Sequence, residues 1–483
     1  MIGERLQIRL SLIFLFLVLL LASWQFLFSR PIVLPDEPYG GIARFIWLDS
    51  INLYLSEGKI LMFPRNTIIQ DVREVRPKSE GYPFIVHTGD QRLEDVWPND
   101  DQGYPFVLSV FLRLWGLNEV TPATFIKFNY LILVTVGIVS SSFLFLSFKS
   151  LLISTVFFYL YLRVHVYDGY VDHHWMIGAM TIFYLSFLIF FLKSRAKFKP
   201  FWFGFYFLVA GIANIVRNGD GTIGIFLVLG VLLIMARQKG LAKTFAFLAP
   251  VNSSLFLRPF LLVIFCIFIY FLPSFILGSA RYFRDKVYFN SGHSNRLTYH
   301  GFWNGAFMGL GYVPNPYGLN WDDDLPISFA RKIDPAVKFH TDKYNEIMRY
   351  LYITYSFKYP HLWLGNLIAK ANDIHGLVGW WIWRGTNGVL PQIASQYLLY
   401  ITLALIFTLT KSDRQSRMIL FTIVVSLLVS SLPGLVALPI SFYLKGFLAA
   451  IFMVFFYLGI LIFLQVKDFF ERRFKLKSLV RYL

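Results

Sequence analysis

Residues 122–147 read PATFIKFNYLILVTVGIVSSSFLFLS, an apolar stretch in which Lys127 is the one charged residue. A helix that crosses the hydrocarbon core of a bilayer needs about 20 mostly apolar residues, and this stretch exceeds that length. Further stretches of the same kind lie on both sides of it. Together, the predicted spans lie near residues 11–29, 122–147, 150–166, 174–192, 201–216, 222–236, 259–279, 391–410, 418–440 and 444–465. The sequence therefore predicts an all-α polytopic membrane protein with about ten transmembrane helices.

The composition of the 483-residue chain favours the same fold class. Hydrophobic residues make up 56% and charged residues 15%, whereas an ordinary soluble domain has ~25% charged residues. A net charge of +17 would suggest nucleic acid in a soluble protein, but basic cytoplasmic loops account for it in a membrane protein. We therefore expect membrane lipids and no nucleic acid as partners. Cys266 is the single cysteine, which excludes an internal disulfide and a thiolate metal cluster.

The distribution of basic residues predicts the orientation of the chain, because Lys and Arg of short loops stay on the cytoplasmic side. Every second connection is basic if the N-terminus is inside. These connections contain Lys149; Lys193, Arg195, Lys197 and Lys199; Arg237, Lys239 and Lys243; and Lys411, Arg414 and Arg417; and the tail from Lys467 to Arg481 is also basic. We expect both termini to be cytoplasmic, in the plasma membrane of a prokaryote, since no eukaryotic retention signal is present.

This orientation places two long segments, 30–121 and 280–390, outside the cytoplasm. The stretch Pro31–Pro105 contains twelve acidic residues against seven Lys and Arg. Its apolar-sided stretches Ile42–Leu55 and Phe106–Leu117 are too short to span and are expected to lie along the membrane surface. We therefore divide the chain into a transmembrane module with a catalytic first outer loop (1–279), an extracytoplasmic region (280–390), and C-terminal helices with a basic tail (391–483).

The first candidate motif, Pro35-Asp36-Glu37-Pro38-Tyr39-Gly40-Gly41-Ile42-Ala43-Arg44, follows the first predicted span directly. Two adjacent carboxylates near a region of low dielectric raise each other's pKa, which suits a general base. A solvated turn is the alternative, because Asp and Pro favour turns.

The second candidate motif, Asp168-Gly169-Tyr170-Val171-Asp172-His173-His174-Trp175, precedes the fourth predicted span. Carboxylates and imidazoles at the mouth of a membrane helix are costly unless they are paired or used, and they are suitable ligands for a divalent cation. Asp172 and His174 can reach one ion only if the segment is extended or just entering the helix. The alternative is a helix N-cap formed by Asp172.

Two further segments are weaker candidates. Residues 97–105 (WPNDDQGYP) contain acids, but turn formation explains most of that pattern. Residues 280–390 are rich in Gly, Trp, Tyr and Asn, which suit a sugar-facing surface, yet Trp and Tyr also gather at membrane interfaces. Arg217, Arg284 and Arg384 lie at the outer ends of predicted helices and could bind phosphate oxygens, or else extend to lipid headgroups.

At this point the layout resembles the GT-C superfamily of integral membrane glycosyltransferases, which take sugars from polyprenyl-phosphate carriers. The pair Asp36-Glu37, with the following Tyr39 and Arg44, looks like that of protein O-mannosyltransferases and aminoarabinose transferases. Residues 167–175 look like the second motif of archaeal-type oligosaccharyltransferases, whose Asp-x-His arrangement helps hold a metal. Those enzymes carry a Trp-Trp-Asp-Tyr-Gly acceptor motif, whereas this chain offers only WWIWRG at 380–385. We therefore expect a lipid, glycan or protein acceptor rather than a sequon.

The resemblance implies an inverting transfer in which Asp36 or Glu37 accepts the acceptor's proton, through an oxocarbenium-like transition state. Charge on the departing phosphate is offset by a divalent cation (Mn or Mg, with Zn as an alternative) or by arginine alone. The expected metal ligands are Asp36, Asp172 and His174, and the expected substrate contacts are Tyr39, Arg44, Asp168, Arg217, Arg284 and Arg384. The rival hypothesis is a secondary transporter or a flippase of lipid-linked intermediates.

Overall fold

A computed structural model provides the fold. It describes residues 2–29, 46–64, 85–87, 93–96, 102–165, 176–193, 199–217, 219–239, 257–288, 302–322, 325–337, 341–385, 392–411, 413–437, 439 and 444–474. Sixteen α-helices lie within these residues, together with one short 3-10 helix and three short strands. The described part of the chain is therefore helical in the main, as the sequence predicts.

Each predicted span corresponds to one helix. These helices are α1 (Ile2–Ser29), α4 (Pro122–Phe148), α5 (Leu151–His165), α6 (Met176–Lys193), α7 (Lys199–Val216), α8 (Asp220–Lys239), α10 (Leu257–Tyr288), α15 (Gln392–Leu409), α16 (Arg414–Val436) and α17 (Lys445–Phe474). Five of them, α4, α6, α10, α16 and α17, are long and apolar enough to cross a membrane, and the others contain shorter apolar segments. This set of helices is that of a multi-pass membrane protein.

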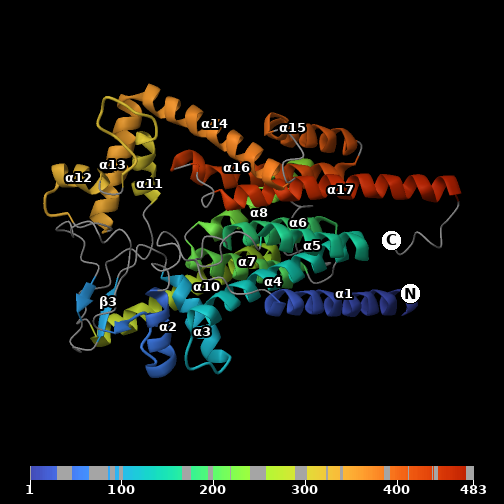
Figure 1. Cartoon of the computed structure of the whole chain (residues 1–483), viewed down its shortest axis with the longest axis horizontal. Helices are drawn as coiled ribbons and strands as arrows, with labels where there is room; N and C mark the ends of the chain where they lie inside the picture. The colour runs from blue at the N-terminus through green and yellow to red at the C-terminus, as the bar shows by residue number, and fades with distance from the viewer. Residues whose placement is uncertain are drawn as a thin grey trace.

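The helices run side by side as a bundle (Figure 1). α1 begins and α17 ends at one end of this bundle, while the helices of the two long connecting segments lie at the opposite end. We call that opposite end, where α2, α3 and α11–α14 gather, the loop end. Both long segments thus emerge on the same side of the bundle.

α6 forms the centre of the bundle. All its residues from Met176 to Leu192 are buried, and it packs against α4, α7, α8, α16 and α17. A helix that is apolar on every side is suited to such a position. Aromatic rings fill the contacts; for example, the ring centroids of Phe187 and Tyr206 lie 4.7 Å apart. The helices before and after the second long segment therefore share one core.

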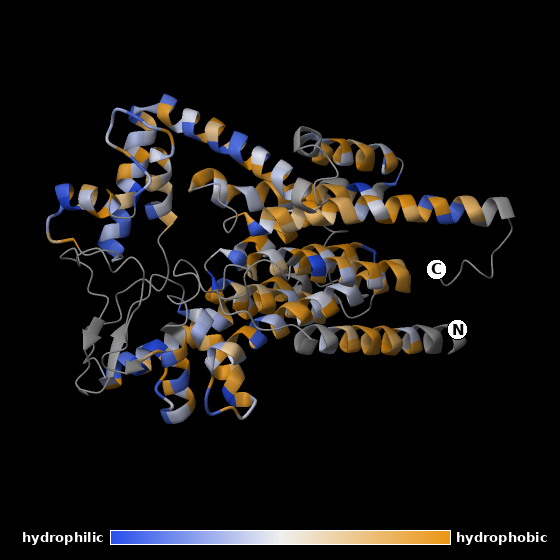
Figure 2. Ribbon diagram, in the orientation of Figure 1, coloured by the Kyte–Doolittle hydropathy of each residue, from blue (hydrophilic) through white to orange (hydrophobic). Residues whose placement is uncertain are grey.

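α1 and α10 lie at the periphery of the bundle. Leu21 of α1 and Phe268 and Phe275 of α10 are among many large apolar side chains that they expose. Figure 2 shows the middle part of α1 as an apolar ribbon. Contiguous exposed apolar surface of this extent fits contact with lipid.

The first long segment contains α2 (Ile46–Glu57) and α3 (Gly103–Leu114), which run across the direction of the bundle (Figure 1). The predicted surface helices, over 42–55 and 106–117, are thus each shifted by a few positions; residues 42–45 lie outside the described residues. A small antiparallel sheet, with strand order β1-β3-β2, joins β1 (Phe63–Pro64), β2 (Ile85–His87) and β3 (Leu93–Val96). The sequence did not predict this sheet.

The second long segment forms a helical unit with a core of its own. Its elements are α11 (Phe302–Met308), the 3-10 helix η3 (Gly309–Gly311), α12 (Leu325–Ile333), α13 (Asp342–Lys358) and α14 (Pro360–Gly385). Phe307, Ala330 and Met348 are fully buried in that core. α14 connects the unit to α15 and α16. α10 also continues to Tyr288, past its predicted end at 279, and so reaches out of the bundle toward the first segment.

Candidate functional site

Most of the sequence-predicted site residues lie outside the described residues. This holds for Asp36, Glu37, Tyr39 and Arg44 of the first motif and for Asp168, Asp172 and His174 of the second. Arg384 belongs to the last turn of α14, but its side chain is not among those described. Arg217 and Arg284 are described in full. The helices that carry the two motifs are also described, and they define where each motif begins.

The two acidic motifs follow neighbouring helices. α1 packs against α4 and α5, and both α1 and α5 run toward the loop end, where they end at Ser29 and His165. The segment with Asp36 begins directly after Ser29. The segment with Asp168 begins directly after His165 and leads into α6 at Met176. The two motifs, which are far apart in sequence, therefore follow two helices that pack against each other and run toward the same end of the bundle.

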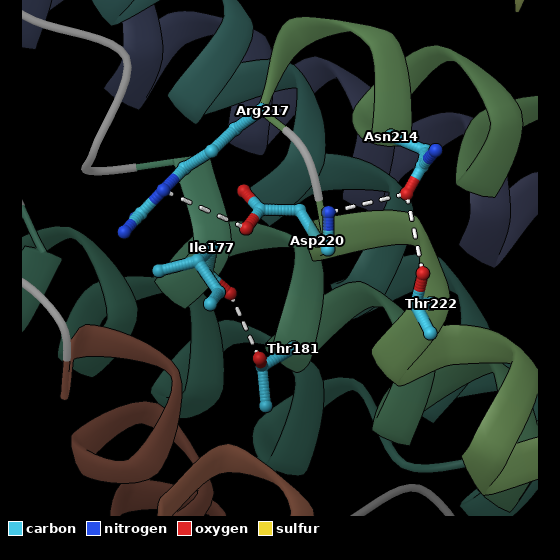
Figure 3. A network of polar contacts seen from close by, with 7 residues as sticks. Ile177, Thr181, Asn214, Arg217, Asp220 and Thr222 are labelled. Carbon is cyan, nitrogen blue, oxygen red and sulfur yellow. Dashed lines mark hydrogen bonds and ion pairs between the residues drawn. The ribbon is translucent and has the colours of Figure 1, made fainter. Parts of the chain in front are cut away.

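Arg217 and Asp220 form an ion pair at the loop end, where α7 passes into α8 (Figure 3). Arg217 Nε lies 4.0 Å from Asp220 Oδ1. The turn between the two helices needs Gly219, because its φ of +99° is unfavourable for residues with a side chain. Asn214 Oδ1 accepts hydrogen bonds from the Gly219 amide at 3.2 Å and the Thr222 hydroxyl at 3.3 Å. These contacts fix the turn that carries the ion pair.

Asp220 is buried, with 2% of its surface exposed. Its second carboxylate oxygen, Oδ2, has no hydrogen-bond partner among the described residues. A buried carboxylate oxygen without a partner costs free energy, so such groups are expected where a ligand or another group completes them. Sequence analysis assigned no role to Asp220, and the only signal was its position next to Arg217.

The start of α3 docks onto the end of α7. A Cβ atom added at Gly103 would lie 1.8 Å from the Ile215 carbonyl oxygen, so only glycine allows this approach. Gln102, 3% exposed, brings a further buried oxygen, Oε1, that has no partner in the described part of the chain. The weak candidate segment 97–105 therefore ends beside the Arg217 turn. The two regions are over a hundred positions apart in the chain, so no local sequence pattern could predict their contact.

Arg284 ties α10 to the first long segment. Its guanidinium lies 2.7 Å from Asp285 Oδ1 and donates a hydrogen bond of 2.7 Å to the Leu61 carbonyl oxygen. Arg284 is 3% exposed, and Asp285 is equally buried. Leu61, Ile215 and Leu277 form a small apolar cluster with Phe106 at this contact. The structure thus brings Arg284 and the α7 end to one junction; its predicted phosphate contact stays a prediction.

A second polar junction holds the helical unit of α11–α14 on α16. Lys370 of α14, 2% exposed, donates a hydrogen bond of 3.0 Å to the carbonyl oxygen of Val436, the last residue of α16. A cation at this position compensates the negative end of the helix dipole. Burial lowers the pKa of Lys370 to about 8. Gly309 leaves room for the contact, since a Cβ there would lie 2.1 Å from the Val436 oxygen. Sequence analysis missed this junction because its members are spread over three elements.

The described residues contain no group of three His, Cys, Asp or Glu side chains that could hold a metal ion. The predicted ligands Asp36, Asp172 and His174 were outside that search. The described junction offers a guanidinium, a buried carboxylate and a buried amide at the loop end, toward which α1 and α5 also run. That combination can hold an anionic group and its counter-charge.

Comparisons of the chain with protein-family models, with curated proteins and with solved structures find no match.

Proposed function

We propose that the chain is a membrane glycosyltransferase that moves a sugar from a polyprenyl-(pyro)phosphate carrier to a lipid, glycan or protein acceptor, as its resemblance to the GT-C superfamily implies. The observation that supports the proposal is the contact between α1 and α5, two packed helices that both run toward the loop end and are followed in sequence by the two acidic motifs. One composite site requires this arrangement, and motifs attached to opposite ends of the bundle would have excluded it.

The proposed topology has ten spans, with both termini in the cytoplasm of a prokaryote and the loop end outside. The alternating basic loops support it, because the basic connections are those at the end where α1 begins. Both long segments share the other end, which agrees with an extracytoplasmic site. Lipid-linked donors could then meet the acidic motifs at the outer membrane interface.

In the proposed reaction, the acceptor hydroxyl oxygen forms a bond to the anomeric carbon while the bond from that carbon to the phosphate oxygen breaks. Asp36, or Glu37, takes the hydroxyl proton, and the phosphate leaves with the bonding electron pair. We assign the guanidinium of Arg217, which pairs with Asp220, to the oxygens of this phosphate. Attack from the side opposite the phosphate inverts the anomeric centre.

A divalent cation remains part of the proposal. Two carboxylates and an imidazole, from Asp36, Asp172 and His174, form a donor set that suits Mn or Mg. Such an ion would offset the charge that develops on a departing pyrophosphate, whereas a monophosphate can leave with arginine alone. Chelation and His174→Ala separate the two cases. If neither changes the activity, arginine alone offsets the charge on the departing phosphate.

Transport is the alternative from another class, and the positions of charged residues disfavour it. Transporters place ionisable residues near the middle of the membrane on broken helices. In the described bundle helices, every Asp, Glu, Lys and Arg lies within about two or three turns of a helix end. The described bundle therefore offers no chain of ionisable groups across the membrane.

The experiment uses the full chain in nanodiscs with a panel of polyprenyl-phosphate and polyprenyl-pyrophosphate sugars. Release of the free carrier is measured for the wild type, Asp36→Asn and the control Asp49→Asn, an exposed carboxylate of α2. We expect release by the wild type and the control, and only a small residual rate by Asp36→Asn, with equal unfolding temperatures. Full activity of Asp36→Asn would remove the assigned base. Lipid or proton translocation without carrier release would favour the transporter.

A further inference from the structure

The turn after α3 exposes two large apolar side chains. Leu114 is 80% and Trp115 59% exposed, and they stand side by side at the tip formed by α3 and the start of α4. Exposed apolar residues that are adjacent and at a protruding tip are costly in water, whereas Trp is enriched at membrane interfaces.

Hydrogen bonds hold the tip in place, so its exposed side chains are built into the fold. Asn52 of α2 pairs with the backbone of Val120 in both directions, with hydrogen bonds of 3.0 and 2.7 Å. Arg113 donates a hydrogen bond of 2.9 Å to the Tyr54 carbonyl oxygen. Gly116 completes the turn with a φ of +74°. α2, α3 and the turn thus form one hairpin, which we call the α2–α3 hairpin.

The ring of Trp115 shows how deep the tip lies relative to the bundle. It contacts the ring of Phe128 in α4, with centroids 5.8 Å apart. Phe128 follows the start of α4 at Pro122 by six residues, which is about 9 Å along a helix. The 27 residues of α4 span about 40 Å, roughly 10 Å more than a hydrocarbon core. If that excess is shared between both ends, Phe128 lies just inside the hydrocarbon boundary.

We propose that the tip of the α2–α3 hairpin inserts into the membrane leaflet at the loop end, with Leu114 among the acyl chains and Trp115 at the headgroup boundary. The partner is the lipid surface itself. The exposed cations Arg113 and Lys127 flank the tip, where lipid phosphates lie. Insertion holds the hairpin at a fixed height above the bundle. This inference does not depend on the proposed transferase activity.

The test measures the depth of spin labels on the full chain. Cys266, the single cysteine and 4% exposed, is replaced by alanine, and one label is then attached at Leu114→Cys. The protein is reconstituted into vesicles of phosphatidylcholine and phosphatidylglycerol. Collision rates with oxygen, which concentrates in lipid, and with a water-soluble nickel complex are compared with those of Leu17→Cys in α1 and Ser56→Cys at the end of α2. We expect the Leu114 label to resemble the Leu17 label more than the Ser56 label.

A water-exposed profile at Leu114, equal to that at Ser56, would overturn the proposal. A second measurement covers the case in which a labelled variant does not fold. In vesicles with brominated lipids, the wild type should lose more tryptophan fluorescence than Trp115→Phe, because the bromine atoms quench an indole at the boundary. Equal fractional quenching in the two proteins would likewise contradict insertion.

Discussion

Arg217 and Asp220 form an ion pair across one turn at the loop end, with Arg217 Nε 4.0 Å from Asp220 Oδ1. Asp220 is buried, while the Arg217 side chain retains 11% of its exposure. A guanidinium held by a buried carboxylate is oriented in advance and loses little side-chain entropy when it binds an anion. α7 and α8, which carry the pair, pack against α6, and α6 directly follows the second acidic motif.

The first prediction concerns this pair. We expect Arg217→Gln to lower the rate of carrier release at least tenfold, about 1.4 kcal/mol in the activation barrier, because the phosphate loses its bidentate donor. Asp220→Asn should reduce the rate less, since the guanidinium remains. Lys127→Gln is the matched control, because it removes an exposed cation near the start of α4, which is also at the loop end. Equal rates for Arg217→Gln and this control would exclude Arg217 as a phosphate contact.

The second prediction concerns the buried pair of Arg284 and Asp285. Arg284→Ala leaves the Asp285 carboxylate buried without its counter-charge, so we expect the free energy of unfolding to fall by about 3–5 kcal/mol. Lys286→Ala, on the exposed face of the same helix, should have little effect. Unfolding of the detergent-solubilised protein by SDS titration measures both. The double variant Arg284→Ala, Asp285→Ala should recover part of the loss; no recovery would mean that the charge pair is not the cause.

The third prediction compares two glycines of the helical unit of α11–α14. Gly309→Ala places a Cβ 2.1 Å from the Val436 carbonyl oxygen, so we expect a loss of roughly 1–3 kcal/mol in the free energy of unfolding. Gly365 lies inside α14 with no atom within 4 Å of an added Cβ. Gly365→Ala should therefore stabilise the protein by roughly 0.5–1 kcal/mol. Similar effects of the two substitutions would contradict the close contact at Gly309.

The fourth prediction is a pH dependence at Lys370. Burial lowers the pKa of this amine from 10.5 to about 8 in the folded protein. Between these two values the unfolded chain binds the proton and the folded chain mostly does not, so the free energy of unfolding rises with pH. The rise approaches about 3 kcal/mol, and below about pH 8 the cost of the buried charge is present in full. The unfolding temperature of the wild type should therefore rise from pH 7.5 to pH 9.5 by more than that of Lys370→Met. Equal changes in the two proteins would refute the lowered pKa of Lys370.

The helices of the bundle could be predicted from the sequence, because a long apolar stretch has few other stable conformations in a membrane. The end of α10 could not. Hydropathy falls at Arg281, yet the helix continues to Tyr288, because Arg284 and Asp285 satisfy each other and bind the first segment. The sheet of β1, β2 and β3 was missed because its strands are two to four residues long and pair across a distance in sequence.

The candidate site shows the same division. Arg217 and Arg284 were selected by residue type and by their position at the ends of predicted helices, and their role as phosphate contacts stays a prediction. Their partners could not be predicted: Leu61 lies 223 positions from Arg284, and Gln102 reaches the α7 end only through the close packing at Gly103. Buried oxygens such as Asp220 Oδ2 become visible only when packing is known.

We propose that Asp36 and His174, which follow the neighbouring helices α1 and α5, act in one site. Rates of carrier release by the wild type, Asp36→Asn, His174→Ala and the double variant test this proposal. Residues that act as a unit have non-additive effects, so we expect the double variant to be no slower than the slower single variant. Losses that multiply, or an unchanged rate in either single variant, would contradict a shared site.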